Sequence, residues 1–248
     1  MIKRALDIGL SLMALFLAAP FLGAAMVAIW LQDFQSPVYL ARRVGRNGAP
    51  FWMFKLRTMI PNADRNGVDS TSMSDPRLTR VGRIIRKVKI DEIPQFINVL
   101  IGDMSLVGPR PNVETETRYY TAVEQRMLNL RPGITDISSI VFSDLNQILK
   151  SSTNANLDYS RYVRPWKSRL ALLYVDCASL DLDIKLILLT ALAAISKSRS
   201  LQFLQLIVRE LGGDEQLCRI VARQEALPTF PPPGRDTIVT EDEIRRGN

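Results

Sequence analysis

The hydrophobic pattern begins with an apolar run from residue 8 to residue 31 that contains no charged side chain. Because about 20 apolar residues suffice for a helix to span a bilayer, this run predicts a membrane helix. Pro20 lies near its middle, where the missing N–H and the ring's clash with the preceding turn break or kink a helix. Each limb would then extend ~18 Å, which is too short to cross a hydrocarbon core ~30 Å thick.

Basic residues flank both ends of this run. They are Lys3, Arg4, Arg42, Arg43 and Arg46. Because positive flanks tend to stay in the cytoplasm, the charges favour a re-entrant helix that enters and leaves on one side of the membrane. A single-pass anchor stays open as the alternative. A cleaved signal peptide is disfavoured because the apolar run continues well past the small residues at 23–25.

Asp7 is an acid at the mouth of the predicted membrane helix. One interpretation makes it an exposed first-turn acid that favours the helix N-terminus. The other makes it an ion-pair partner of Arg4 or of the rest of the protein. The sequence alone leaves both open.

After residue 35 the pattern changes to short strands. The segments 38–40 and 51–56 surround a glycine-containing turn and predict a pair of strands. Alternation along the second strand would place Lys55 and Arg57 on one face. Residues 61–75 are polar and predict a long surface loop, of the length that often forms an active-site lid.

Helical periodicity dominates the rest of the chain. It is clearest over 78–90, where an apolar arc faces away from a basic one. Further helices are predicted over 115–130, 162–178 and 182–196, the last apolar enough to be buried or interfacial. Residues 199–226 predict one or two amphipathic helices. The tail that follows is rich in proline and is predicted to be extended rather than packed.

Charge and composition restrict the chemistry. The chain has 248 residues, a formal net charge of +7 and a pI near 9.6, which favour anionic partners: nucleic acid, an acidic membrane or phosphorylated substrates. It contains no histidine, so Ser–His and Cys–His catalysis and His-ligated zinc are excluded. Cys177 and Cys218 stand apart in apolar surroundings and are predicted to be buried free thiols.

The most informative motif is the adjacent pair Asp91 and Glu92, which follows a stretch, 77–89, with several basic residues and no acid. A positive field favours ionised carboxylates, which suits a nucleophile or a Mg²⁺ ligand better than a general acid. Downstream, a Gly-Pro-Arg-Pro corner is expected to aim Arg110 at the same place. A carboxylate, fixed cations and a divalent ion are the groups that move a phosphoryl group.

These motifs together resemble the monotopic phosphoglycosyl transferases, the bacterial sugar transferase family, and specifically its compact branch. The resemblance extends from about Lys3 to Ile195. Its blocks are Lys3, Arg4 and Asp7, the helix with Pro20, and the segments 43–45, 54–59, 75–82, 91–92, 102–111 and 131–135. Ala19, Lys89 and Ile90 depart from the usual family residues.

The resemblance implies a fold of the α/β class, helix-rich α+β in detail. A re-entrant helix would occupy 1–35, broken near Pro20, and a compact catalytic body with interfacial amphipathic helices would occupy 36–198. A helical extension and a Pro-rich tail would form 199–248. The implied place is the bacterial inner membrane, with the catalytic body on the cytoplasmic face.

The implied reaction moves a sugar-1-phosphate from a UDP-sugar to polyprenyl phosphate, usually undecaprenyl phosphate, and releases UMP. It begins the assembly of a polysaccharide or another glycoconjugate. By this resemblance Asp91 is the nucleophile that forms an aspartyl-phosphosugar, and Glu92 either binds the metal or positions the site. Mg²⁺ is the implied cofactor, with Asp91 and Glu92 as its candidate ligands. The candidate phosphate-binding residues are Arg86 and Arg110 and, as weaker candidates, Lys55 and Arg57.

Two other classes compete with this interpretation. A membrane-attached binder of nucleic acid or anionic lipid would use the basic face of 77–89, but few aromatic residues accompany it for stacking. Asp91 and Glu92 would also repel a polyanion, so no nucleic-acid partner is expected. A structural anchor explains the ends of the chain and not its middle. The expected partners are the UDP-sugar, polyprenyl phosphate and membrane lipids; the sugar and a homo-oligomer are left open.

Overall fold

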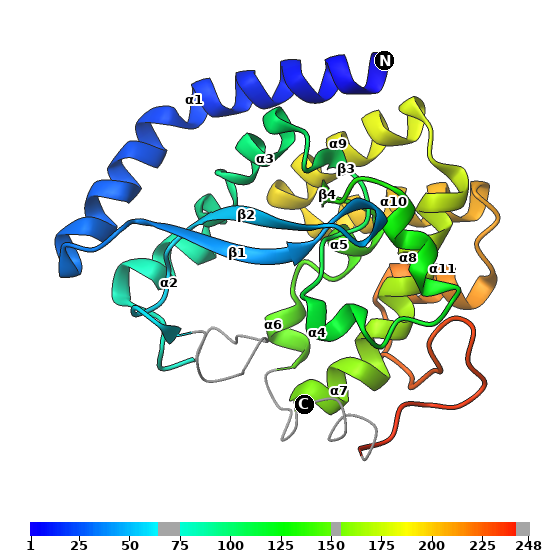
Figure 1. Cartoon of the computed structure of the whole chain (residues 1–248). Helices are drawn as coiled ribbons and strands as arrows, with labels where there is room; N and C mark the ends of the chain where they lie inside the picture. The colour runs from blue at the N-terminus through cyan, green and yellow to red at the C-terminus, as the bar shows by residue number, and fades with distance from the viewer. Residues whose placement is uncertain (64–74, 150–154, 242–248) are drawn as a thin grey trace. The chain divides into compact units, whose positions relative to one another are not determined.

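The computed structural model of the chain describes residues 1–63, 75–149 and 155–241 (Figure 1). Most of the polar loop predicted at 61–75 lies outside the described residues. The chain forms two compact units, which are interleaved in sequence. The first comprises Met1–Arg43 and Pro50–Leu106, and the second comprises Val44–Ala49 and Val107–Asn248. The division into 1–35, 36–198 and 199–248 follows the expected roles of the segments, whereas the two units follow their contacts. The functional division stays a prediction.

The first unit is built on a long helix and a strand pair. Its elements are α1 (Ile2–Asp33), β1 (Val38–Val44), β2 (Pro50–Leu56), α2 (Arg80–Lys87), the 3-10 helix η3 (Ile90–Glu92) and α3 (Gln95–Ile101). β1 and β2 form a two-stranded sheet, so the predicted strand pair is confirmed, with longer strands than the pattern indicated. Leu56, Ile85 and Ile29 meet in a small apolar core that joins β2, α2 and α1.

The helix α1 runs from Ile2 to Asp33 with Pro20 inside it. Of the two outcomes expected at Pro20, the complete break is therefore wrong, because the residues on both sides of Pro20 stay helical. Figure 1 shows the helix bending between its ends instead. A proline removes one backbone hydrogen bond and its ring crowds the preceding turn, and a bend can absorb both while the flanking apolar residues stay helical. Re-entry into a membrane stays a prediction.

The N-terminal end of α1 is bound to the rest of the first unit. Arg4 donates from Nη1 to the carbonyl of Val99 (2.5 Å) and from Nη2 to that of Leu100 (2.8 Å). These carbonyls lie near the C-terminus of α3, where a cation is favourable. Asp7 is only 3% exposed and accepts hydrogen bonds from Ser105 Oγ (2.9 Å) and Leu106 N (3.0 Å). Both expectations for Asp7 were wrong, because its partners are neutral donors.

Most of α1 presents apolar side chains to the surroundings. Among the described residues, α1 is the one helix whose length and composition would allow it to cross a membrane. Only 11% of its most apolar 18-residue segment is buried. Phe16, Leu17 and Phe21 are all more than half exposed. An apolar surface of this extent indicates contact with lipid or with another apolar surface.

The second unit is mostly helical. Its elements are α4 (Glu114–Thr117), η4 (Glu124–Asn129), β4 (Gly133–Thr135), α5 (Ile137–Val141), α6 (Leu145–Ile148), α7 (Ala155–Asp158), the π-helix η5 (Tyr159–Val163), α8 (Arg164–Cys177), α9 (Leu180–Ile195), α10 (Lys197–Glu210) and α11 (Glu215–Ala222). β4 pairs with β3 (Ser105–Val107), whose last residue belongs to this unit. The helices predicted at 162–178, 182–196 and within 199–226 are confirmed.

The helix predicted over 115–130 is wrong, because the chain stops and restarts within it. Thr121 N donates to Glu124 Oε2 (3.0 Å), and Glu124 N donates to Thr121 Oγ1 (3.1 Å). This reciprocal pair is a capping box, which begins a new helical turn. It separates α4 from η4.

The Pro-rich tail is irregular but packed, so the prediction of an unpacked tail is wrong. Trp166 Nε1 donates to Pro228 O (2.9 Å), and the Trp166 and Phe230 rings lie 4.8 Å apart. Pro232 and Pro233 are buried, and Thr121 Oγ1 donates to Pro233 O. Prolines lack an N–H but keep a carbonyl acceptor, so side-chain donors of the second unit can hold such a segment in place.

Candidate functional site

Asp91 and Glu92 lie where the chain turns out of α2. Thr79 caps the start of this helix by accepting from Gly82 N (2.9 Å). Gly82 itself lies against Thr58, where a Cβ atom would come within 2.0 Å of the Thr58 carbonyl oxygen, so only glycine fits. After α2 ends, Lys89 adopts a left-handed conformation (φ 59°) that turns the chain into η3, which holds both carboxylates. The sharp turn therefore sets the position of the dyad.

The structure brings four predicted residues of the first unit to one place. Asp91 is buried, with 6% of its surface exposed. Lys55, on β2, lies with its Nζ 3.3 Å from Glu92 Oε1. Arg86, on α2, is partly buried and close enough for Asp91 and Glu92 to influence its ionisation. Two adjacent carboxylates and two cations therefore share one corner of this unit.

Burial changes the expected ionisation of Asp91. Removal from water raises the pKa of the Asp91 carboxyl, and the charge of Glu92 raises it further, while Lys55 and Arg86 act in the opposite direction. The sequence-based expectation that the basic stretch would dominate is thus wrong, because desolvation outweighs the two cations. Burial also lowers the pKa of the Arg86 guanidinium, against the pull of Asp91. Additional positive charge near Asp91 would favour its ionised form.

Arg57 has a different partner. Its Nη1 and Nη2 donate to the two carboxylate oxygens of Asp33, each at 2.6 Å. A bidentate arginine–carboxylate pair of this kind fixes geometry, and here it joins the last turn of α1 to the end of β2. This contact favours a structural role, and binding of phosphate by Arg57 stays a prediction.

The dyad is compatible with magnesium. The described residues contain no group of three or more His, Cys, Asp and Glu side chains that could hold a metal ion. Mg²⁺, however, is commonly bound by one or two carboxylates together with substrate phosphates and water. Asp91 and Glu92, adjacent and facing cations rather than a closed cage, supply a donor set of that kind.

Arg110 belongs to the second unit, so its relation to the dyad stays a prediction. Pro109 and Pro111 flank it, and Gly108 and Gly133 touch so closely that a Cβ on Gly133 would lie 2.1 Å from Gly108 N. Two backbone hydrogen bonds reinforce this contact: Gly108 N to Thr135 O and Gly133 N to Pro109 O, both 3.0 Å. The structure thus joins the Gly-Pro-Arg-Pro corner to the Arg-Pro-Gly segment at 131–133.

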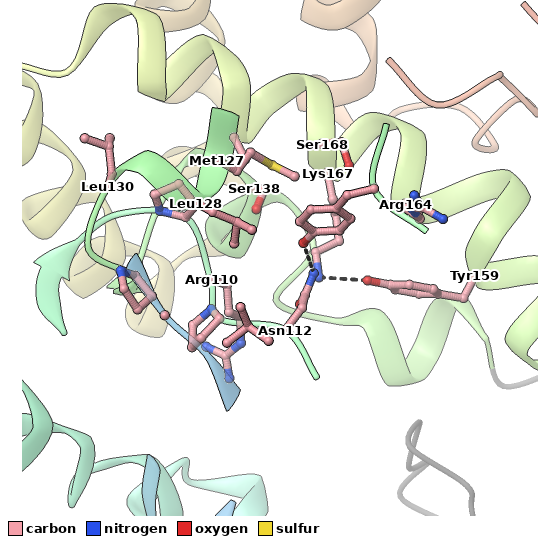
Figure 2. Close-up of a pocket in the computed structure, with 17 residues that line it drawn as sticks. Arg110, Asn112, Met127, Leu128, Leu130, Ser138, Tyr159, Arg164, Lys167 and Ser168 are labelled. Carbon is pink, nitrogen blue, oxygen red and sulfur yellow. Dashed lines mark hydrogen bonds between the residues drawn. The ribbon is translucent and has the colours of Figure 1, made fainter. Parts of the chain in front are cut away.

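Arg110 lines a pocket of the second unit (Figure 2). The polar side chains around it come from distant segments. They are Arg110, Asn112, Tyr120, Ser138, Tyr159, Arg164, Lys167 and Ser168. Sequence reasoning missed all of these except Arg110. Tyr159 and Lys167 lie on η5 and α8, and no spacing in the sequence signals that they meet the Arg110 corner.

Hydrogen bonds fix the polar wall of this pocket. Lys167 Nζ donates to Tyr159 Oη (3.3 Å), and Asn112 Nδ2 donates to Tyr120 Oη (2.7 Å), both visible in Figure 2. Arg164 Nη2 lies 2.8 Å from an oxygen of the fully buried Glu124. Burial lowers the pKa of Lys167; Glu116 and Asp136 oppose that shift, whereas Arg110 adds to it. Tyr159 begins a π-helix, a distortion that is frequent at functional sites.

Comparison with known sequences agrees with these motifs. The sequence pattern of the family described as bacterial sugar transferase matches residues 1–197. A UDP-glucose:undecaprenyl-phosphate glucose-1-phosphate transferase of Caulobacter vibrioides is 37% identical over 172 residues, which cover 66% of this chain and 64% of that protein. The exopolysaccharide production protein ExoY of Rhizobium meliloti is 35% identical over 181 residues, 67% of this chain and 78% of that protein.

A third relative shows how far the lengths differ. The UDP-N-acetylgalactosamine-undecaprenyl-phosphate N-acetylgalactosaminephosphotransferase of Aeromonas hydrophila is 44% identical over 114 residues, which cover 46% of this chain and 27% of that protein. The chain thus spans less than two thirds of the length of several curated relatives that it matches. Residues after 197, with most of α10, α11 and the tail, lie outside the family match.

Proposed function

This chain belongs to the bacterial sugar transferase family, and we propose that it transfers a sugar-1-phosphate from a UDP-sugar to polyprenyl phosphate and releases UMP. The observation that carries the proposal is the buried Asp91 beside Glu92, with Lys55 and Arg86 next to them. The relatives include undecaprenyl-phosphate sugar-phosphate transferases, and their names support the same substrates. The product would begin the assembly of a polysaccharide or glycoconjugate.

In the first step, an Asp91 carboxylate oxygen attacks the phosphorus that bears the sugar. The bond from that phosphorus to the oxygen bridging it to UMP breaks, and UMP leaves with the electron pair. In the second step, a phosphate oxygen of the polyprenyl phosphate attacks the same phosphorus. The bond to Asp91 breaks, the carboxylate returns, and the sugar diphosphate stays on the lipid. Two displacements through a covalent intermediate suit an acid that is positioned for attack.

The neighbours of Asp91 provide charge and position. Arg86 and Lys55 oppose the rise in the Asp91 pKa that burial causes, so they favour the attacking, ionised form. Glu92 holds the Lys55 ammonium at 3.3 Å. Asp91 and Glu92 would also hold Mg²⁺, which when bound supplies positive charge to the phosphates. The same cations are suited to binding the phosphate oxygens of the donor.

For the membrane we propose a re-entrant α1, with the catalytic body on the cytoplasmic face of the bacterial inner membrane. Both ends of α1 bind the first unit: Arg4 and Asp7 at its start, and Asp33, through Arg57, at its end. A helix that crossed the membrane would separate these ends by the ~30 Å thickness of the hydrocarbon core. Contacts at both ends with one compact unit therefore support a helix that enters and returns.

Turnover of the purified protein in detergent tests the reaction. The assay supplies undecaprenyl phosphate, Mg²⁺ and a panel of UDP-sugars, and it measures UMP release together with sugar-phosphate in the lipid fraction. A sugar labelled on its phosphate should attach to the wild-type protein when the lipid is omitted, and should not attach to an Asp91→Asn variant. Asp181→Asn, an exposed acid of α9, is the matched control. In this mechanism the wild-type protein should release at most one equivalent of UMP when the polyprenyl phosphate is omitted, so repeated turnover without that lipid would contradict the proposed acceptor.

A further inference from the structure

The pocket of the second unit contains chemistry that the proposed displacements do not use. Lys167 reaches the pocket from the first half of α8, and the side chains of Arg110, Tyr159 and Lys167 line it together (Figure 2). Lys167 donates a hydrogen bond to the Tyr159 hydroxyl, a neutral group. Among residues 1–63, 75–149 and 155–241, no carboxylate lies within ion-pair distance of the Lys167 ammonium.

Two acids outside the pocket lining bind residues that belong to it or lie next to it. Asp136 accepts from Ser138 Oγ and from Ser139 N, and Glu124 binds Arg164 and Ser168. Glu116 acts on Lys167 in the favourable direction, but burial and the charge of Arg110 act against the ammonium, and the net effect lowers its pKa. Arg110 Nη1 donates to Ile134 O (3.4 Å), and the charge of Arg110 acts against the Lys167 ammonium. An anion bound between the two cations would lower their mutual repulsion.

We propose that Lys167 and Arg110 together bind phosphate oxygens of a substrate in this pocket, with the Tyr159 hydroxyl orienting the ammonium. A phosphate group offers several oxygens in a tetrahedral arrangement. A planar guanidinium can take two of them, and a point-like ammonium can take another. A carboxylate offers only two oxygens in one plane, so the combination of Arg and Lys fits phosphate better.

Contacts outside the pocket fix the positions of the residues that line it. The two prolines and the Gly108–Gly133 contact fix the backbone on both sides of Arg110. On α8, the residues on either side of the Lys167–Ser168 pair bind the tail: Trp166 contacts Phe230, and the Arg169 guanidinium lies 4.5 Å from the centre of the Phe230 ring. A pre-formed wall of this kind keeps cations in place before the ligand arrives, which reduces the entropy cost of binding.

This inference rests on the proposed function for the identity of its ligand, since both proposed substrates are phosphate esters. The donor carries a diphosphate and the acceptor a lipid monophosphate, and either would present the same oxygens. Equilibrium binding distinguishes the two sources and needs no turnover. The probes are UDP and UMP for the donor and farnesyl phosphate in detergent micelles for the acceptor, titrated against the purified full-length protein.

The decisive variant is Lys167→Met, which removes the charge and keeps the length of the side chain. We expect the dissociation constant of one probe class to rise about 10- to 100-fold, the range of a hydrogen bond to a charged group. Lys185→Met, which removes an exposed lysine of α9 that pairs with Asp181, should change neither class. Arg110→Gln combined with Lys167→Met should cost less than the sum of the single effects, because both residues would bind one group.

If the dissociation constants rise for UDP and UMP alone, the pocket binds the donor. If the dissociation constant rises for farnesyl phosphate alone, the pocket binds the acceptor. Unchanged binding of both classes by a folded Lys167→Met variant would overturn the proposal. If that variant does not fold, Tyr159→Phe replaces it. Removal of the hydroxyl should weaken the same class a few-fold, and unchanged binding would overturn the role of the ammonium. A wild-type protein that binds the phosphate probes but has no transferase activity would contradict the proposed function only.

Discussion

The two units contain buried charge in opposite arrangements. In the first, Asp91 is buried beside Glu92, and Lys55 and Arg86 offset part of the cost. In the second, burial and Arg110 both act against the charge on Lys167. We propose that the first arrangement prepares a carboxylate that attacks, and that the second binds an anion. A change in the first unit should therefore affect the chemical step, and a change in the second should affect binding.

The strongest way to test this contrast is to remove the nucleophile. Asp91→Asn is nearly isosteric but cannot attack phosphorus, so we expect turnover to fall by at least ~10³-fold, while binding of UDP stays close to that of the wild type. Asp91→Glu should lose about 100-fold or more, because a shift of ~1 Å spoils the attack geometry. UMP release and UDP titration measure the two quantities. An Asp91 variant that keeps a tenth of the activity would exclude the covalent route.

The second test concerns Arg110 and separates charge from geometry. Arg110→Lys keeps the charge but loses the planar fork, so we expect binding of the phosphate ligand to weaken about 10-fold or more. If Arg110 only supported the corner between Pro109 and Pro111, Lys and Ala variants would behave alike. Measured dissociation constants for the wild type and both variants decide between the two roles. Binding by the Lys variant as tight as in the wild type would contradict phosphate contact.

The same contrast explains which part of the site the sequence predicted. The dyad and the basic stretch before it lie within one short segment, so residue order alone places Asp91, Glu92 and Arg86 together. The pocket draws on segments from Val44 to Ala171, and the partners Tyr159 and Lys167 follow from packing. The direction of the Asp91 pKa was also beyond the sequence, because it depends on how deeply the carboxyl is buried.

The fold shows the same limit. Long helices such as α8 and α9 were predicted correctly, since the pattern of apolar residues along one segment is a local property. The restart at Thr121 depends on a reciprocal hydrogen bond with Glu124, which the apolar pattern hides. The tail was taken as unpacked from its prolines, because Phe230 and Trp166 lie far apart in sequence and only the folded chain brings their rings together.

The third test changes the Pro-rich tail of the second unit. A substitution there should affect the second unit and leave the first unchanged. Phe230→Ala removes the contacts with Trp166 and Arg169, and we expect the second unit to lose about 1–2 kcal/mol of stability. Phosphate binding should weaken a few-fold, because α8 would hold Lys167 less firmly. Thermal unfolding and ligand titration measure these effects. Phe203→Ala, an exposed residue of α10, is the control, and equal effects of the two substitutions would contradict a bracing role.

The smallest expected effect concerns the first unit and the bend of α1. Pro20→Leu restores a backbone donor and removes the ring clash, so the helix could straighten and span the membrane. We expect only a minor fraction of molecules to invert, because Arg4 and Asp7 bind the N-terminal end of α1 to the first unit. Adding Asp7→Ala, which breaks the bonds to Ser105 and Leu106, should increase that fraction. Labelling of a cysteine placed at position 2 in intact cells measures it, with a tag at residue 248 as the cytoplasmic reference. Strong external labelling at position 2 in the otherwise unaltered protein would mean that α1 crosses, and the contacts at both of its ends would then have to form without a return.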